Sequence, residues 1–193
     1  LDLCAAPGMK TSQLAALLGM GTLVACDLSA NRLRTMARVL RGKIPAEVRL
    51  HVVRLDAGIE LPFACAFDRI LLDVPCLGTG TLARNPEIKW RLQARDLPRL
   101  AATQAKMLCG ALRALAPGGR LVYATCSLEP EENEQVVESV LGGNPDVRLM
   151  AAAELAGEFP ALKPLFDSRG FFRTRPDLHR MDGFFAAVIV RAA

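Results

Sequence analysis

Apolar and polar positions follow two alternating patterns along this chain. Short apolar runs, each of strand length, occupy residues 1–4, 22–26, 48–54, 67–72, 120–124, 147–150 and 184–190. Between them, apolar residues recur at the spacing of an amphipathic helix in segments 11–18, 30–40, 96–115 and 131–141. This alternation predicts an α/β fold with a mostly parallel sheet and helices on both of its faces.

Turn and cap residues refine these boundaries. Ser29 is a suitable N-cap for the helix that begins at residue 30. The run Pro117-Gly118-Gly119 is expected to end the long helix that begins at residue 96. Asn133 is interpreted as part of a helix start.

The C-terminal third of the chain is less regular. Residues 159–182 contain several Pro, Arg and Phe residues without a clear period, and we expect this segment to cover the functional site. Phe184 and Phe185 begin the last apolar run and are expected in the core.

Composition narrows the class of protein. The chain has 193 residues, of which 51% are apolar and spread along its length, so one domain with a sizeable core is expected. No apolar run reaches the roughly 18 residues that a membrane span needs. The net charge of +4 is a mild indication of a polyanionic partner.

The cysteines indicate a reducing compartment. Six cysteines without C-x-x-C spacing, and only two histidines, argue against a metal site and against a disulfide framework. No signal peptide is visible, so we expect a cytoplasmic protein, and a monomer. Four cysteines are interpreted as small buried apolar residues: Cys4, Cys26, Cys65 and Cys109.

Acidic residues follow three successive predicted strands. Asp27, Asp56 and Asp73 each come at or just after a strand end, and residues 5–10 form a turn of small residues before the first helix. In open α/β sheets, ligands bind at the carboxyl ends of the strands, and a helix N-terminus offers free N–H groups. The set predicts a pocket for a nucleoside-type cofactor. The alternative is that each aspartate only caps a turn.

Two further cysteines stand at equivalent places. Cys76 lies in LLDVPCLGTG and Cys126 in LVYATCSLEPEEN, each after a β-prone apolar run. Both thiols are therefore expected at the same edge of the sheet as the acids. Two thiols beside a nucleoside-type pocket suggest covalent chemistry on a base.

The motifs CAAPGMKT, DVPC and ATCS, in this order, resemble those of RNA cytosine-5 methyltransferases of the Sun/NOL1/NOP2 type. RNPEIKW and PGGRLVYATCSLEPEENE are most similar to the bacterial 16S ribosomal RNA branch. The resemblance runs from Leu1 to the final MDGFFAAVIVR. It implies the class I, Rossmann-like methyltransferase fold with a seven-stranded, mostly parallel sheet. One difference is Met9, where the family usually has a second glycine.

The resemblance also implies the extent of the domain and its partners. Residues 1–193 correspond to the catalytic domain, and we expect the family's N-terminal RNA-binding region to be missing from this chain. The cofactor is S-adenosyl-L-methionine, and the substrate is RNA, most similar to the small-subunit ribosomal RNA of the bacterial branch. The implied cofactor-binding residues are Cys4, Ala5, Ala6, Pro7, Gly8, Met9, Lys10, Asp27, Arg32, Asp56, Asp73 and Pro75.

In the family, each cysteine has its own task. The cysteine of the TCS motif, here Cys126, attacks C6 of cytosine and makes C5 nucleophilic. The cysteine of the DxPC motif, here Cys76, assists release of the product. Asp73 is expected to hydrogen-bond the base, and Lys10 to contact it and lower a neighbouring thiol pKa.

Two basic stretches are candidates for RNA contact. Basic side chains neutralise phosphates, and aromatic side chains stack on unpaired bases. We expect RNA to contact Arg84, Lys89, Arg91, Arg173 and Arg175, beside the aromatic residues Trp90, Phe171 and Phe172. The alternative for any one arginine is an ordinary solvated position.

Two other functions remain open. In a DNA cytosine-5 methyltransferase the cysteine of the PC motif is the nucleophile, so Cys126→Ser would retain activity there and abolish it in the RNA enzyme. A catalytically silent RNA-binding assembly factor would bind RNA without turnover.

Overall fold

The computed structural model describes residues 1–64 and 66–193, so the expectation for Cys65 lies outside the described residues. The strands are β1 (Gly21–Asp27), β2 (Val48–Arg54), β3 (Phe67–Asp73), β4 (Leu115–Thr125), β5 (Val147–Leu149), β6 (Phe172–Thr174) and β7 (Phe184–Arg191). The α-helices are α1 (Met9–Leu18), α2 (Ala30–Leu40), α3 (Ile88–Arg91), α4 (Asp96–Arg113), α5 (Glu134–Leu141), α6 (Ala152–Glu158) and α7 (Pro176–His179).

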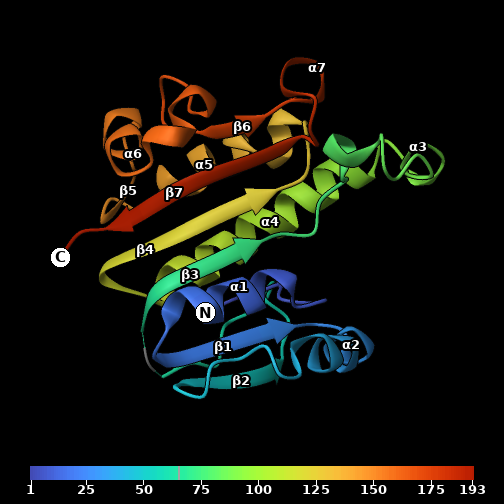
Figure 1. Ribbon diagram of the computed structural model, residues 1–193. Coiled ribbons are helices and arrows are strands. Elements are labelled where there is room, and N and C mark those ends of the chain that lie inside the picture. Colours follow the sequence, from blue (N-terminus) through green and yellow to red (C-terminus); the bar gives the residue numbers. More distant parts are fainter. Residues whose placement is uncertain (65) are drawn as a thin grey trace.

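The sheet is mixed. β1 pairs with β2, and β3 with β4, in parallel, whereas β7 runs antiparallel to β4, β5 and β6 (Figure 1). Asp2 joins the two halves through isolated parallel bridges to Ala25 in β1 and Leu71 in β3. The strand expected at residues 1–4 is reduced to these bridges. Within the described chain, β7 is the strand that departs from the expected parallel direction.

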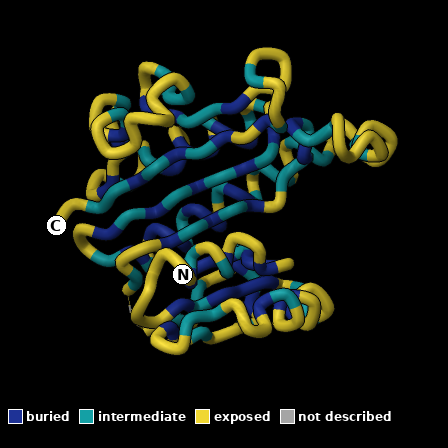
Figure 2. Tube along the Cα trace, viewed as in Figure 1, coloured by how far each residue is buried: buried dark blue, intermediate teal, exposed yellow. Residues whose placement is uncertain are grey.

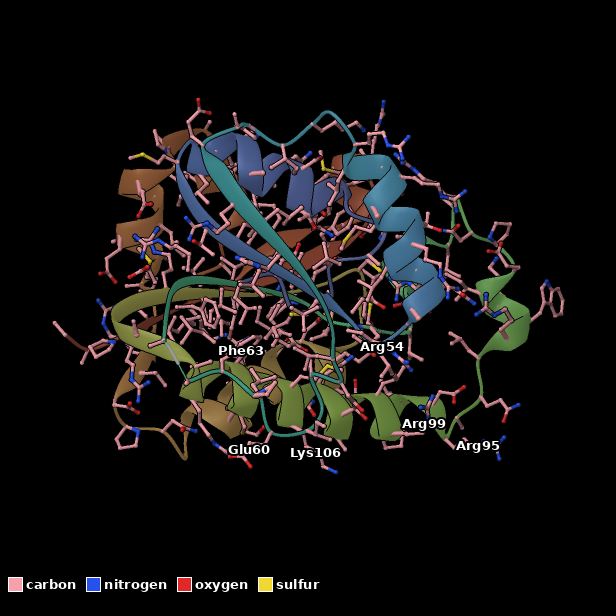
Figure 3. All side chains as sticks on the ribbon, turned by 90° about the horizontal axis from the view of Figure 1, so that it is seen from below. Arg54, Glu60, Phe63, Arg95, Arg99 and Lys106 are labelled. Carbon is pink, nitrogen blue, oxygen red and sulfur yellow. The ribbon has the colours of Figure 1, made fainter. Side chains whose placement is uncertain are left out.

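Helices cover both faces of the sheet, as expected. Figure 3 shows α1 and α2 on one side of the strands and α4 on the other. On one face, Leu33 and Met36 of α2 pack against Ala25 of β1. On the other, α4 and α5 bury their apolar faces in the main core, with Leu108 and Val137 fully enclosed. Buried residues concentrate along the strands, and exposed ones on α3 and the outer loops (Figure 2).

Two predicted helix boundaries need correction. The long helix ends at Arg113, and Pro117-Gly118-Gly119 lies inside β4 instead of capping the helix. The pairing of β3 with β4 shifts here, from Phe67 opposite Leu115 to Arg69 opposite Arg120, so the three residues form a bulge. Gly118 has a φ of +69°, which suits such a bulge. The helix expected at 131–141 begins at Glu134, after a 3₁₀ turn at Pro130–Glu132.

The segment 159–182 is more ordered than its sequence indicates. It contains a 3₁₀ helix (Pro160–Leu165), β6 and α7. Phe185 is buried as expected, but Phe184 is 41% exposed, because neighbouring residues of a strand point to opposite faces. Ser29 caps α2 as predicted, since its side chain accepts a hydrogen bond from Arg32 N. Within the described residues, no helix is both long and apolar enough to cross a membrane.

Candidate active site

The two thiols expected at one sheet edge lie in contact. Cys76 follows β3 and Cys126 follows β4, and these strands are parallel neighbours with Asp73 opposite Ala124. Their loops therefore leave the sheet at the same edge, where the arrowheads of β3 and β4 point in Figure 1. The Sγ atoms of Cys76 and Cys126 are 3.4 Å apart, which is hydrogen-bond distance for sulfur.

The contact shifts the pKa values of the two thiols in opposite directions. Hydrogen bonding from the Cys76 thiol lowers the pKa of Cys126, and the charge of Lys10 acts in the same direction. The same hydrogen bond, together with burial, raises the pKa of Cys76. The thiolate is the nucleophilic form of cysteine, and these shifts favour ionisation of Cys126 over ionisation of Cys76.

The other described cysteines are placed as inert residues. Burial raises the pKa of Cys4 to about 12 and that of Cys26 to about 12. Cys109 is partly buried and packs against the main core. Among the described cysteines, only Cys126 combines a sulfur contact with a lowered pKa.

A buried polar network, which sequence reasoning missed, holds the Cys76 loop. Glu132 is fully buried, and both of its carboxylate oxygens lie 3.1 Å from Leu77 N. Gln104 Nε2 donates to Glu132 Oε1 and to the carbonyl oxygen of Pro75, each at 2.9 Å. The Tyr123 hydroxyl donates to the Glu132 carbonyl oxygen at 2.6 Å. The polar Gln104 on an otherwise apolar helix face was the one available signal.

The Cys126 loop has its own support. Asn133 is buried, accepts from Thr125 Oγ1 at 2.6 Å and donates to the Ser127 carbonyl oxygen at 3.0 Å. Asn133 is the N-cap residue of α5, as expected of a helix start. Its side chain makes no cap hydrogen bond, however, and instead bonds to the residues on either side of Cys126. Gly80 N donates to the Cys126 carbonyl oxygen at 2.9 Å, which ties the two cysteine loops together.

A cavity of about 290 Å³ opens beside the thiols, on the side of β1. Ligand pockets at the carboxyl ends of parallel strands are typical of this fold class. Seven of the twelve residues expected to bind the cofactor line this cavity: Cys4, Ala6, Asp27, Arg32, Asp56, Asp73 and Pro75.

The three aspartates differ in their protein contacts. Asp27 accepts from Ser29 N at 2.9 Å and Ala6 N at 3.3 Å, and Asp56 accepts from Gly58 N at 2.8 Å. These two aspartates therefore cap turns as well as line the cavity, so the alternative interpretation describes part of their role. Asp27 also forms an ion pair with Arg32, at 3.3 Å. Asp73 pairs with Lys10, with Nζ to Oδ2 at 2.5 Å.

The remaining residues of the first turn lie outside the lining of this cavity. They are Ala5, Pro7, Gly8, Met9 and Lys10. Gly8 has a φ of +101°, and a Cβ there would be 2.6 Å from Met36 Cγ, so this glycine lets α1 approach α2 closely. Met9 is the first residue of α1 and is 56% exposed.

Three of the five arginines and lysines expected to contact RNA are already paired. Arg84 pairs with Asp182 at 3.1 Å, Arg173 with Glu134 at 2.8 Å and Arg175 with Asp177 at 2.6 Å. Lys89 and Arg91 are exposed on α3. In the part of the chain that the structure describes, neither forms an ion pair. Of the five expected RNA contacts, the two that form no ion pair in the described chain are thus on α3.

Within residues 1–64 and 66–193, no group of three or more His, Cys, Asp or Glu side chains is placed to hold a metal ion.

The sequence profile described as 16S rRNA methyltransferase RsmB/F matches residues 1–190 of this chain. The chain is 38% identical to ribosomal RNA small subunit methyltransferase B of Klebsiella pneumoniae, over 99% of this chain and 41% of that protein. It is 35% identical to methyltransferase F of Serratia proteamaculans, over 97% of this chain and 39% of that protein. The chain spans about two fifths of the length of these relatives.

Solved structures agree in fold. NSun6 from Pyrococcus horikoshii, determined with SFG, superposes with a TM-score of 0.81 at 29% identity, over 100% of this chain and 47% of that one. A methyltransferase homologue from the same organism superposes with a TM-score of 0.75 at 35% identity, over 98% of this chain and 60% of that one. The fold is that of S-adenosylmethionine-dependent methyltransferases, and this chain belongs to the 16S rRNA methyltransferase RsmB/F family.

Proposed function

We propose that this chain is the catalytic part of an enzyme that methylates C5 of a cytosine in small-subunit ribosomal RNA. The observation that carries the proposal is the 3.4 Å contact between Cys76 and Cys126 beside an acid-lined cavity. RNA methylation at C5 needs one thiol to activate the base and a second group to release it, and the pair supplies both. The match to rRNA methyltransferases B and F supports ribosomal RNA as the substrate.

The cavity residues suit the cofactor. When bound, S-adenosylmethionine supplies an electrophilic methyl group. Asp27 and Asp56 present carboxylates to a nucleoside, of the kind that accept hydrogen bonds from ribose hydroxyls or an adenine amino group. Pro75 lines the cavity immediately before Cys76, so a cofactor held in this cavity would lie next to the loop that carries this thiol.

Cys126 begins the reaction. Its lowered pKa favours the thiolate, which adds to C6 of cytosine and leaves an electron pair at C5. Asp73 accepts a hydrogen bond from the exocyclic amino group, and the Lys10 ammonium beside it offsets the negative charge that develops on the base. With the cofactor bound, C5 would then form a bond to the methyl carbon while the bond from that carbon to the sulfonium sulfur breaks, and S-adenosylhomocysteine would be the leaving group.

Cys76 completes the reaction through a change in its own acidity. In the free enzyme, its pKa is raised first by the hydrogen bond to Cys126, and burial and the Cys126 charge act in the same direction. Once Cys126 is a thioether on C6, the thiolate that caused two of these effects no longer exists. Cys76 can then lose its own proton to solvent water, and its thiolate accepts the C5 proton. The electron pair of the C5–H bond re-forms the C5–C6 double bond as the C6–S bond breaks, which returns Cys126 as a thiolate.

The test is a denaturing gel. Cys76→Ala, incubated with S-adenosylmethionine and unmodified small-subunit ribosomal RNA, should accumulate a protein–RNA adduct. Adding Cys126→Ser should abolish that adduct, and Cys109→Ala should behave like the unaltered chain. Binding of S-adenosylmethionine is measured separately by calorimetry.

The outcomes separate the candidate functions. Methylation by the single variant Cys126→Ser, in which Cys76 is intact, would assign the nucleophile to Cys76, as in DNA cytosine-5 methyltransferases. RNA binding with neither adduct nor methylation would support the silent assembly factor. Either result refutes the proposed roles of the thiols.

A further inference from the structure

A second cavity, of about 200 Å³, lies on the other side of the Cys76 loop from the cofactor cavity. Cys76 and Leu77 line one side of it, and α3 and the start of α4 line the other. Because Pro75 faces the cofactor cavity and the next two residues face this one, the loop separates the two.

This cavity adjoins the reacting thiols without containing them both. Cys76 lines it, whereas Cys126 does not. A Cβ added at Gly78 would lie 3.2 Å from Ile88 Cδ1 and 3.9 Å from Cys126 Sγ, so the wall residue Ile88 stands about one residue from the nucleophile. An occupant of the cavity would sit next to the target base and not in its place.

The walls and rim differ in character. Leu77, Ile88, Leu92 and Leu100 supply apolar surface. Arg91, Arg99 and the acidic Asp96 supply charged groups to the lining, and the exposed Lys89 and Arg95 are close to them in sequence. Figure 3 shows Arg95 and Arg99 at the end of α4 nearest α3.

These cations are available to a ligand. Lys89, Arg91 and Arg95 form no ion pair in the described part of the chain, and Arg99 makes a single contact, with Asp96 at 3.4 Å. Trp90, on the same short helix, is 89% exposed, which is unusual for so large an apolar side chain. Unpaired cations around apolar and aromatic surface are typical of single-stranded nucleic-acid sites.

The volume limits the occupant. About 200 Å³ is the liquid volume of roughly six or seven waters, which is room for one base. We propose that this cavity is a subsite for the unpaired RNA nucleotide adjacent to the target cytosine. Its base enters between Leu77 and Leu100, Arg91 holds the phosphate, and Trp90 stacks on a base further out. The inference rests on the proposed function, since it supplies the neighbour of the methylated base.

The first test is kinetic. Arg91→Glu should raise the KM for RNA about tenfold or more and leave kcat within twofold, because the contact it removes is equally strong in the ground state and the transition state. Arg113→Glu, the same change at the exposed far end of α4, is the matched control and should leave both constants within twofold. The RNA-binding constant of Arg91→Ala should depend less steeply on salt, by about 0.7 in the logarithmic slope for one single-strand phosphate contact.

The second test locates the neighbour. RNAs carry 4-thiouridine on either side of the target cytosine, and the crosslinked peptide is identified by mass spectrometry. We expect a crosslink within residues 88–92 from one of the two positions. An abasic residue at that position should raise the KM as Arg91→Glu does.

Each outcome decides between the claims. If the unaltered chain methylates RNA and Arg91→Glu has the same kinetic constants as Arg113→Glu, the subsite is refuted and the proposed function stands. A crosslink at 88–92 without any methylation would retain the subsite and refute the proposed function. Methylation with crosslinks only elsewhere would refute the subsite.

Discussion

The buried carboxylate of Glu132 should be worth far more than an ordinary surface glutamate, and Glu132→Gln tests this. Its two oxygens are the hydrogen-bond acceptors for Leu77 N and, through Oε1, for Gln104 Nε2. A glutamine of the same shape replaces one oxygen by an NH₂ group. That group would face Leu77 N. Leu77 N would then keep only Oε1 as an acceptor, and the new NH₂ group would be a buried donor without an acceptor.

The magnitude follows from these contacts. A hydrogen bond to a charged group contributes about 1.5–3 kcal/mol, and a buried donor left without an acceptor costs about 1–3 kcal/mol. We therefore expect Glu132→Gln to lower the free energy of unfolding by about 2–3 kcal/mol. For a domain of this size that lowers the Tm by roughly 4–12 °C. The loss is a large part of the roughly 5–15 kcal/mol that stabilises a typical domain.

The assay is thermal and urea unfolding followed by circular dichroism. Glu131→Gln makes the same change one residue earlier, where the structure shows no side-chain hydrogen bond, and should change the free energy of unfolding by less than about 0.5 kcal/mol. Gln104→Leu removes the other side-chain partner, so the double variant should lose less than the sum of the single losses. Equal effects of Glu131→Gln and Glu132→Gln would refute the role given to the network.

Three further predictions concern the thiols, a buried acid and a tight loop contact. Cys76→Ala removes the donor that lowers the pKa of Cys126, so the midpoint of iodoacetamide alkylation at Cys126 should move to higher pH; an unchanged midpoint would contradict the contact. Burial raises the pKa of Asp2 from 3.8 to about 6. The protonated Asp2 side chain therefore contributes to the free energy of unfolding fully below about pH 4, and this contribution is lost as the pH rises through 6. The loss is about 3 kcal/mol, because a rise of one pKa unit corresponds to roughly 1.36 kcal/mol. Urea unfolding from pH 4 to 7 should show this loss in the unaltered chain and not in Asp2→Asn. A Cβ at Gly80 would lie 2.2 Å from the Gly183 carbonyl oxygen, so Gly80→Ala should destabilise by about 1–3 kcal/mol, whereas Gly157→Ala, which meets nothing within 4 Å, should not. Equal unfolding midpoints for the two glycine variants would argue against the close approach.

Much of the architecture could be predicted because it depends on local pattern. The bounds of α2 and β2 agree with the sequence, since a cap such as Ser29 and a strand-length apolar run are local features. The boundaries that failed depend on pairing. Pro117-Gly118-Gly119 reads as a helix stop, but the register of β3 against β4 makes it a bulge.

The sequence by itself determined the chemistry that this chain can carry. It placed Cys76, Cys126 and three aspartates after strands, and parallel strands bring their carboxyl ends to one edge of the sheet. Residue type and order were sufficient for this, because each signal lies within about ten residues.

Only the tertiary structure decided how those groups act on one another. Which thiol holds the proton depends on a 3.4 Å contact between residues 50 positions apart. Arg173 is neutralised by Glu134, whereas Arg91 has no ion pair in the described chain. This difference depends on how elements far apart in the sequence pack together. Hydrogen bonds and ion pairs act over a few ångströms, and the distances between residues far apart in sequence are set only when the whole chain has folded.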